Sequence, residues 1–355
     1  MVDPRIVEHA KIVVNYSCRV RKGDNVLVLT SSEAIPLVRE IAREVGRAGG
    51  QLLVLLSEDS ISRAYALEAD DDALEVLPKP LEQLIAGSDV LINARATSNA
   101  KEMSDIPPRK MMLTSRAMGP LQTIIEKKRW NITLHPTPAL AQEAGKSFEA
   151  FADFVYGATL VDWPGMVKKM QVLADRMAAT KDVRIVGKET DITLSIQGRK
   201  PIIDGGEKNL PGGEVFTSPV DESANGTVYF DKPIIFAGSE VSGVRVTFKN
   251  GRVTDHRAEV GGEFLGALLD TDEGAKRLGE LGIGMNRGIR EFSKNILFDE
   301  KMGDTIHLAL GLAFEEAGGR NKSGIHIDMV KGMRDGGVIY FDDEPIYKSG
   351  KFVWE

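Results

Sequence analysis

The sequence predicts an α/β protein in two parts, a doubly wound α/β domain at residues 1–182 and an α+β domain at residues 183–355. In the first part, apolar strand-like runs alternate with amphipathic helical runs, which is typical of a parallel sheet covered by helices. Beyond residue 181, short alternating runs are separated by Gly, Asn and Asp, which is typical of strands joined by tight turns. A length of 355 residues suits two domains.

The N-terminal part begins with a βαβ unit. The run NVLVLT at residues 25–30 predicts a buried strand, residues 33–48 predict an amphipathic helix that ends at a pair of glycines, and residues 51–56 predict a second strand. The first strand leads into Ser31-Ser32-Glu33, which caps a helix but lacks the GxGxxG pattern of a dinucleotide pocket. The pattern continues with helices at residues 71–76, 81–86, 119–129 and 164–179, and a strand at residues 89–93.

The C-terminal part reads mainly as strands. We expect strands at residues 183–186, 191–196, 226–230, 243–248 and 325–330, and a helix at residues 271–281. The segment Lys249-Asn250-Gly251-Arg252 predicts a hairpin turn, because Asn-Gly suits the positive φ angles of a two-residue turn.

Composition narrows the possible partners. A net charge of -7 and a pI near 5.5, with no block of basic residues, argue against nucleic acid or an anionic membrane as partner. The only cysteine, Cys18, excludes an intrachain disulfide and a cysteine-based zinc site. No apolar run approaches the roughly 18 residues of a membrane span, so we expect a cytoplasmic protein.

The best candidate for a metal site is His326-x-Asp328. In a strand, side chains alternate between faces, so His326 and Asp328 share one face while Ile325, Ile327 and Met329 share the other. An imidazole and a carboxylate held by a rigid strand suit a borderline divalent cation.

Three further segments carry acids or histidines in unusual settings. Glu214 follows a glycine pair, Glu280 lies among apolar residues and glycines, and Glu300 precedes His307 in an apolar run. Each has a plainer interpretation: an exposed turn acid, a carboxylate paired with arginine, or a hydrogen-bonded core histidine. If all six residues converge, however, four carboxylates share one cavity, and repulsion would force protonation unless about two divalent cations intervene. Such a pair of ions can activate water and polarise a carbonyl for hydrolysis.

These motifs resemble the M29 family of metallo-aminopeptidases over essentially the whole chain. The resemblance rests on the ordered series Pro-Gly-Gly-Glu214, Gly-Glu280, Phe-Asp-Glu300, His307-Leu-Ala-Leu-Gly and His326-x-Asp328. It implies a C-terminal catalytic domain that binds two divalent metals (Zn, Co, Mn or Mg), a homodimer, and short peptides as substrates. It also implies the metal ligands, with Glu280 bridging both ions: Glu214, Glu280, Glu300, His307, His326 and Asp328. For the hydrolysis itself, Glu280 and Glu214 are the candidate bases.

Two positions depart from the family pattern. Phe314 stands where relatives commonly have a tyrosine, and a phenyl ring cannot donate a hydrogen bond to an oxyanion. Glu300 lies about two residues farther from His307 than the family spacing, so its place among the ligands is the least secure.

Two alternatives stay open. A related family of mononuclear iron(II) ring-cleaving dioxygenases, which act on dihydroxypyridine, shares the His-x-Asp element but has a histidine at the position of Glu280 and lacks the Gly-Gly-Glu acid. The second alternative is a metal that only stabilises the fold, without catalysis. The sequence does not exclude it, because it does not reveal whether the metal has an open coordination position.

Overall fold

The computed structural model describes residues 3–236 and 239–355, and the chain forms two compact units. The first unit contains Met1–Leu160 and Gly206–Pro211, and the second contains Val161–Gly205 and Gly212–Glu355. Helix α9 (Trp163–Ala179) belongs to the second unit because Met170, Leu173 and Met177 lie in its hydrophobic core. The predicted boundary after residue 182 lies at the other end of this helix.

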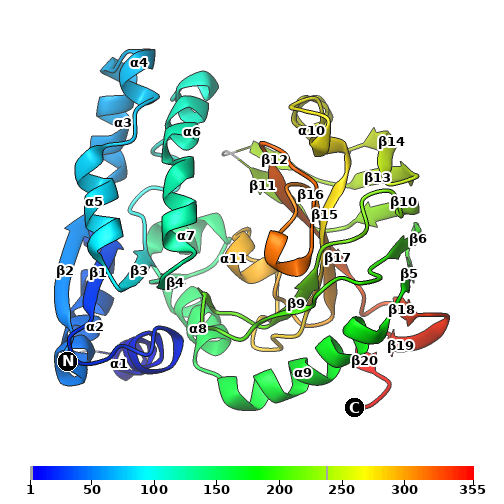
Figure 1. Ribbon diagram of the computed structural model, residues 1–355, viewed down its shortest axis with the longest axis horizontal. Coiled ribbons are helices and arrows are strands. Elements are labelled where there is room, and N and C mark those ends of the chain that lie inside the picture. The colour runs from blue at the N-terminus through cyan, green and yellow to red at the C-terminus, as the bar shows by residue number, and fades with distance from the viewer. Residues whose placement is uncertain (1–2, 237–238) are drawn as a thin grey trace. The chain divides into compact units, whose positions relative to one another are not determined.

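The first unit is built on a parallel sheet with strand order β2-β1-β3-β4-β8 (Figure 1). Its strands are β1 (Asn25–Thr30), β2 (Gln51–Leu56), β3 (Val90–Arg95), β4 (Arg129–Leu134) and β8 (Asn209–Leu210). Its helices are α1 (Pro4–Lys11), continued by a π-helical turn at Ile12–Ser17, α2 (Ile35–Ala48) after a 3-10 turn at Ser32–Ala34, α3 (Asp59–Glu68), α4 (Asp71–Leu74), α5 (Lys79–Gly87), α6 (Pro108–Ile125), α7 (Pro138–Glu143) and α8 (Phe148–Thr159).

This unit confirms the predicted α/β class. Leu27 of β1 and Leu91 of β3 pack against Ile85 of α5 and Leu121 of α6, so these helices cover one face of the sheet. The predicted helix at residues 119–129 is wrong at its C-terminal end. Helix α6 ends at Ile125, and strand β4 begins at Arg129, with alternating Trp, Ile and Leu that suit a strand.

The second unit contains two antiparallel sheets around one core (Figure 1). The longer sheet has the order β14-β13-β10-β6-β5-β18-β19-β20, and the other, which we call the site sheet, has the order β17-β16-β15-β9-β7. The core contains apolar side chains from both sheets and from helices α9 and α10.

The bounds of the remaining elements are as follows. The longer sheet contains β5 (Asp182–Gly187), β6 (Thr190–Ser195), β10 (Asn225–Phe230), β13 (Val244–Lys249), β14 (Arg252–Arg257), β18 (Val338–Phe341), β19 (Glu344–Lys348) and β20 (Lys351–Phe352). The site sheet contains β7 (Ile202–Asp204), β9 (Glu214–Thr217), β15 (Leu278–Gly284), β16 (Thr305–Gly311) and β17 (His326–Gly332). Outside them lie the hairpin β11 (Ile234–Phe236) and β12 (Ser239–Val241), helices α10 (Gly262–Leu269) and α11 (Ile296–Asp299), and 3-10 turns at Gly274–Lys276 and Glu315–Ala317.

The turn at residues 249–252 joins β13 to β14 as predicted, with Asn250 and Gly251 at positive φ. The predicted helix at residues 271–281 is wrong. Only the 3-10 turn Gly274–Lys276 is helical there, and Glu280 lies in strand β15. The alternation of glycine and apolar residues from position 278 to 284 suits a strand that is buried on both faces.

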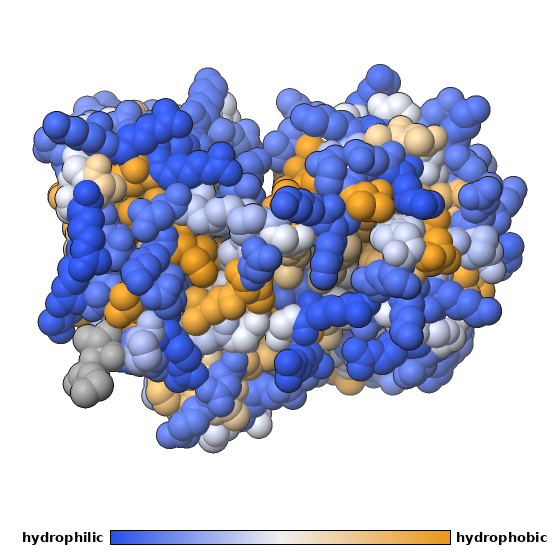
Figure 2. All heavy atoms as spheres, turned by 90° about the horizontal axis from the view of Figure 1, so that it is seen from below, coloured by the Kyte–Doolittle hydropathy of each residue, from blue (hydrophilic) through white to orange (hydrophobic). Residues whose placement is uncertain are grey.

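No helix in the described part of the chain is both long and apolar enough to span a bilayer. Hydrophilic side chains predominate on the face shown in Figure 2, with hydrophobic patches between them.

Candidate metal centre

Strands β9, β15, β16 and β17 place most of the candidate ligands on one face of the site sheet. The residues that alternate with them lie in the core of the second unit: Val215, Leu281, Ile283, Leu308, Ile327 and Met329. Because strand side chains alternate between faces, the candidates face the opposite side: Glu214, Glu280, His307, His326 and Asp328. The predicted orientation of His326 and Asp328 away from the core therefore agrees with this packing.

Small residues on the same face make room for these side chains. Gly282 is paired with His307 across β15 and β16, and a Cβ atom at position 282 would lie 1.9 Å from His307 Cε1. Ala309 is likewise paired with Asp328. The sequence analysis did not assign a role to Gly282, although its alternation with Glu280 in the strand was a usable signal.

The candidates form two groups that share one residue. Glu214, Glu280 and His307 form the first group, and Glu280, His326 and Asp328 form the second, each with ligand atoms within 4.8 Å of one another. Oε1 of Glu280 lies 3.3 Å from Nε2 of His307, and Oε2 lies 3.2 Å from Nε2 of His326. The two oxygens of one carboxylate therefore face two different groups, which is the arrangement of a bridging ligand.

Both imidazoles are oriented by backbone carbonyls. Nδ1 of His307 lies 3.0 Å from the carbonyl oxygen of Glu300, and Nδ1 of His326 lies 2.8 Å from that of Leu312. A carbonyl oxygen only accepts, so each Nδ1 carries the hydrogen and Nε2 faces the carboxylates. A neutral ring would point its Nε2 lone pair at those oxygens, so Nε2 must be either protonated or bound to a cation.

The electrostatics of the site favour cations. Burial lowers the pKa of each histidine, but the carboxylates outweigh it: Glu214 and Glu280 raise the pKa of His307 to about 10, and Asp328 and Glu280 raise that of His326 to about 12. Burial raises the pKa of Glu214 well above its ordinary value. Two further buried oxygens face the imidazoles: Glu214 Oε2 lies 3.3 Å from Nε2 of His307, and Asp328 Oδ1 lies 3.4 Å from Nε2 of His326. Carboxylate oxygens and imidazole nitrogens held in this way fit a divalent ion such as zinc.

Lys301 is a member of the site that the sequence analysis missed. Its side chain is fully buried, and Nζ contacts the carboxylate of Glu300 and lies 3.3 Å from Glu214 Oε1 and 3.9 Å from Asp204 Oδ2. A buried lysine requires compensating charge, and these three acids supply it. A lysine directly after the candidate ligand Glu300 was the available signal.

Glu300 occupies a different position from the other five candidates. It follows helix α11 directly, and its carboxylate pairs with Lys301 and is in neither of the two groups of ligand atoms. Its backbone carbonyl, by contrast, accepts the hydrogen of His307 Nδ1. In this structure Glu300 orients one candidate ligand and balances the charge of Lys301.

Phe314 lies beside the second group. Its ring centroid is 4.9 Å from that of His326 and 5.5 Å from that of Phe216. Its backbone N–H donates to Ser218 Oγ at 3.2 Å, which fixes the loop between β16 and β17. The position where relatives commonly have a tyrosine is therefore next to the candidate ligands.

The chain resembles known proteins along almost its full length. The profile of the family described as thermophilic metalloprotease (M29) matches residues 2–352. Aminopeptidase 2 of Geobacillus stearothermophilus is 26% identical over 410 residues, covering 99% of this chain and 98% of that protein. Aminopeptidase T of Thermus thermophilus is 27% identical over 402 residues, covering 97% of each chain. Aminopeptidase AmpS of Bacillus subtilis is 26% identical over 403 residues, covering 98% of each.

The fold also has a solved counterpart. The structure of wild-type AmpT from Thermus thermophilus superposes with a TM-score of 0.86 at 23% identity and covers 99% of both chains. At this identity the likeness establishes the fold, and it confirms the predicted α/β class.

Proposed function

Because the chain belongs to the M29 family of thermophilic metalloproteases, we propose that it is a metal-dependent aminopeptidase that hydrolyses the N-terminal peptide bond of short peptides with two divalent ions. The relatives that it matches over their full length bear the name aminopeptidase. The observation that carries the proposal is Glu280, whose two oxygens face two separate groups of ligand atoms.

Charge balance supports two ions. Five carboxylates in this site lie within 4 Å of Lys301, His307 or His326: Asp204, Glu214, Glu280, Glu300 and Asp328. One ammonium, that of Lys301, leaves four negative charges when both imidazoles are neutral. Two divalent cations would neutralise these charges, whereas a single ion would leave the buried site with excess negative charge.

We assign the ligands accordingly. Glu214 and His307 would hold one ion, His326 and Asp328 the other, and Glu280 would bridge them; Glu300 as a sixth ligand stays a prediction, because Lys301 already pairs with its carboxylate. When bound, such ions supply Lewis acidity toward the scissile carbonyl and an acidified water. Glu214 and Glu280 remain the candidate proton acceptors.

A cavity next to the second group could hold the N-terminal side chain of the peptide. It has a volume of about 180 Å³ and includes His326 and Asp328 in its wall. Most of the remaining wall is apolar, with Ile234, Ile235, Phe292, Ile296, Ile327 and Val330. Apolar walls around a few polar groups are the usual composition of a ligand pocket. We therefore expect apolar N-terminal residues to be cleaved fastest.

The proposal is tested by metal analysis combined with two assays on one preparation. We expect two metal equivalents and cleavage of leucine p-nitroanilide. One iron per chain with oxygen uptake on a dihydroxypyridine would instead identify the dioxygenase, and bound metal without either activity would identify a structural site. Retention of both Glu214 and Glu280 is the reason that we place the dioxygenase second.

The homodimer and the cytoplasmic location also remain proposals. Light scattering on the purified protein would measure the mass in solution, and a mass of one chain, 38.7 kDa, would contradict the dimer. Cell fractionation would test the location.

A further inference from the structure

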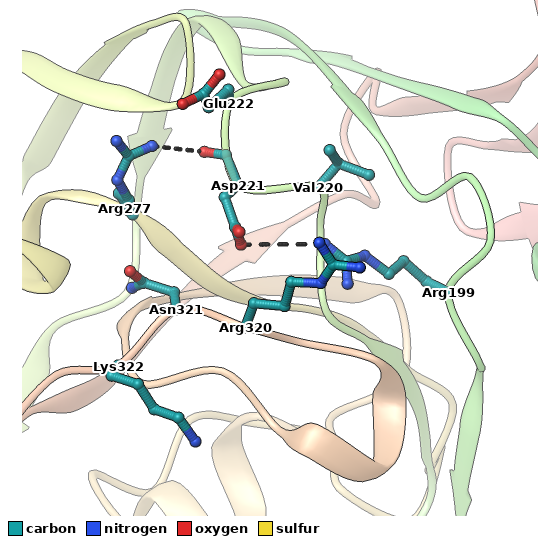
Figure 3. A pocket seen from close by; sticks show the side chains of 8 residues that line it. All are labelled: Arg199, Val220, Asp221, Glu222, Arg277, Arg320, Asn321 and Lys322. Carbon is teal, nitrogen blue, oxygen red and sulfur yellow. Dashed lines mark hydrogen bonds and ion pairs between the residues drawn. The ribbon is translucent and has the colours of Figure 1, made fainter.

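A second cavity in the second unit, of about 560 Å³, collects basic side chains (Figure 3). Arg199, Arg277, Arg320 and Lys322 line it together with the acids Asp221 and Glu222. We call it the basic pocket. The pocket wall therefore carries more positive than negative side chains, in a chain whose net charge is -7.

Arg199 is the most constrained of these cations. Its side chain is only 9% exposed, and its Nε is buried without a hydrogen-bond partner among the described residues. Its nearest acid is Asp221, where Nη2 and Oδ1 are 4.0 Å apart, beyond hydrogen-bond length. Asp221 Oδ1 also lacks a hydrogen-bond partner within residues 3–236 and 239–355. A buried N–H group without an acceptor is costly, so the pocket is preorganised to bind an acceptor.

Two other arginines reach the same cavity. Figure 3 shows Arg199 and Arg320 extending toward its centre from opposite sides. Arg277 donates from Nη1 to the backbone carbonyl of Asp221 at 3.1 Å, which positions its guanidinium at the wall. Lys322 is turned away from the arginines in this view and pairs with Glu315, so the arginines are the groups available to a ligand.

We infer that the basic pocket is a binding site for a small oxyanion, either inorganic phosphate or the C-terminal carboxylate of a peptide. Guanidinium groups present paired donors that match the oxygens of carboxylate and phosphate. An oxyanion would accept a hydrogen bond from the buried Nε–H of Arg199 and relieve the repulsion between the converging guanidiniums. The negative charges of Asp221 and Glu222 lower the affinity of the pocket for anions held by charge alone. A ligand must therefore accept hydrogen bonds directly from the arginines.

The basic pocket is connected to the metal centre by the chain itself. The loop between β16 and β17 carries Arg320 at the pocket and Phe314 beside His326. Asn321 fixes this loop, since its Nδ2 donates to the carbonyl oxygens of Gly274 at 2.8 Å and Gly311 at 2.6 Å. On the other wall, Arg277 directly precedes β15, the strand of Glu280. The basic pocket and the metal centre therefore share the loop between β16 and β17.

Calorimetric titration of the metal-loaded protein with inorganic phosphate tests the site. We expect Arg199→Gln and Arg320→Gln each to weaken phosphate binding by about tenfold or more, the effect of losing a charge-assisted hydrogen bond. Arg257→Gln is the matched control, because it removes the same charge from an exposed residue of β14 outside the pocket. Phosphate that binds only the metal ions would be insensitive to all three changes, and that result would overturn the inference. Arg320 is exposed, so its variant keeps the test valid if Arg199→Gln fails to fold.

Peptides distinguish the two sources of oxyanion. If the pocket binds a peptide carboxylate, Leu-Gly-Gly should have a lower KM than its C-terminal amide, and Arg199→Gln should abolish that difference. If the pocket binds free phosphate alone, the KM ratio is the same in both proteins while phosphate binding still depends on Arg199. This peptide comparison rests on the proposed aminopeptidase function, whereas the phosphate titration does not. A protein without peptidase activity that still binds phosphate through Arg199 would therefore separate the two proposals.

Discussion

Replacing Gly282 by alanine tests how the strand geometry positions the metal centre. A Cβ at this position would lie 1.9 Å from Cε1 and 2.1 Å from Nε2 of His307. Ordinary contact begins at 3.4 Å, so the ring would have to move by about 1.5 Å. Metal–ligand distances tolerate only about 0.2 Å of change, so His307 would no longer serve as a ligand.

We expect Gly282→Ala to lose one of the two proposed metal equivalents and to lower kcat/KM by about a hundredfold or more. The group of Glu280, His326 and Asp328 does not contain His307 and should keep its ion. Metal content after dialysis, combined with hydrolysis of leucine p-nitroanilide, measures both effects. Gly262→Ala is the control, because nothing lies within 4 Å of a Cβ there.

Two bound metal ions with normal turnover in Gly282→Ala would refute this reasoning. Circular dichroism must show that the variant is folded before the metal is counted. His307→Ala removes the same proposed ligand without a steric clash, so it should reproduce the loss of one ion. If it retains both ions, His307 is not a ligand.

Three further predictions follow from the same structure. Metal binding at pH 7.5 should release at least two protons, because the pKa values of about 10 and about 12 keep His307 and His326 charged without metal. Affinity should therefore rise with pH, and calorimetry in buffers of different ionisation enthalpy would count the protons. Phe314→Tyr should preserve kcat, or raise it by up to about a hundredfold if the hydroxyl reaches the oxyanion. A large loss of activity in the anilide assay would show instead that packing against His326 limits the side chain at this position. Burial lowers the pKa of His9 to about 3 and that of His135 to about 4, whereas both titrate near pH 6.5 in the unfolded chain. The free energy of unfolding should therefore be about 2 kcal/mol lower per histidine at pH 5 than above pH 6.5, because only the unfolded chain binds these protons. Urea unfolding at pH 5 and 7.5 measures this loss. If the free energy of unfolding depends on pH in His9→Gln as it does in the original protein, the prediction for His9 is contradicted.

The sequence alone determined the kind of fold and much of the candidate site. Alternating patterns gave the parallel and antiparallel parts because hydrophobic periodicity depends only on neighbouring residues. The same local rule put His326 and Asp328 on one face of a strand. It failed at residues 271–281, where acids and helix-forming residues suggested a helix but burial on both faces favoured a strand.

Only the tertiary structure decided how distant residues meet. It placed Glu280 between two imidazoles, set Gly282 against the ring of His307, and surrounded Lys301 with three acids. It also grouped Arg199 with Arg320 from separate loops in one cavity. These contacts join residues that are tens of positions or more apart in the chain, and no local pattern carries that information. Local periodicity therefore identified which side chains leave the core, whereas the register between strands decided which of them share a site.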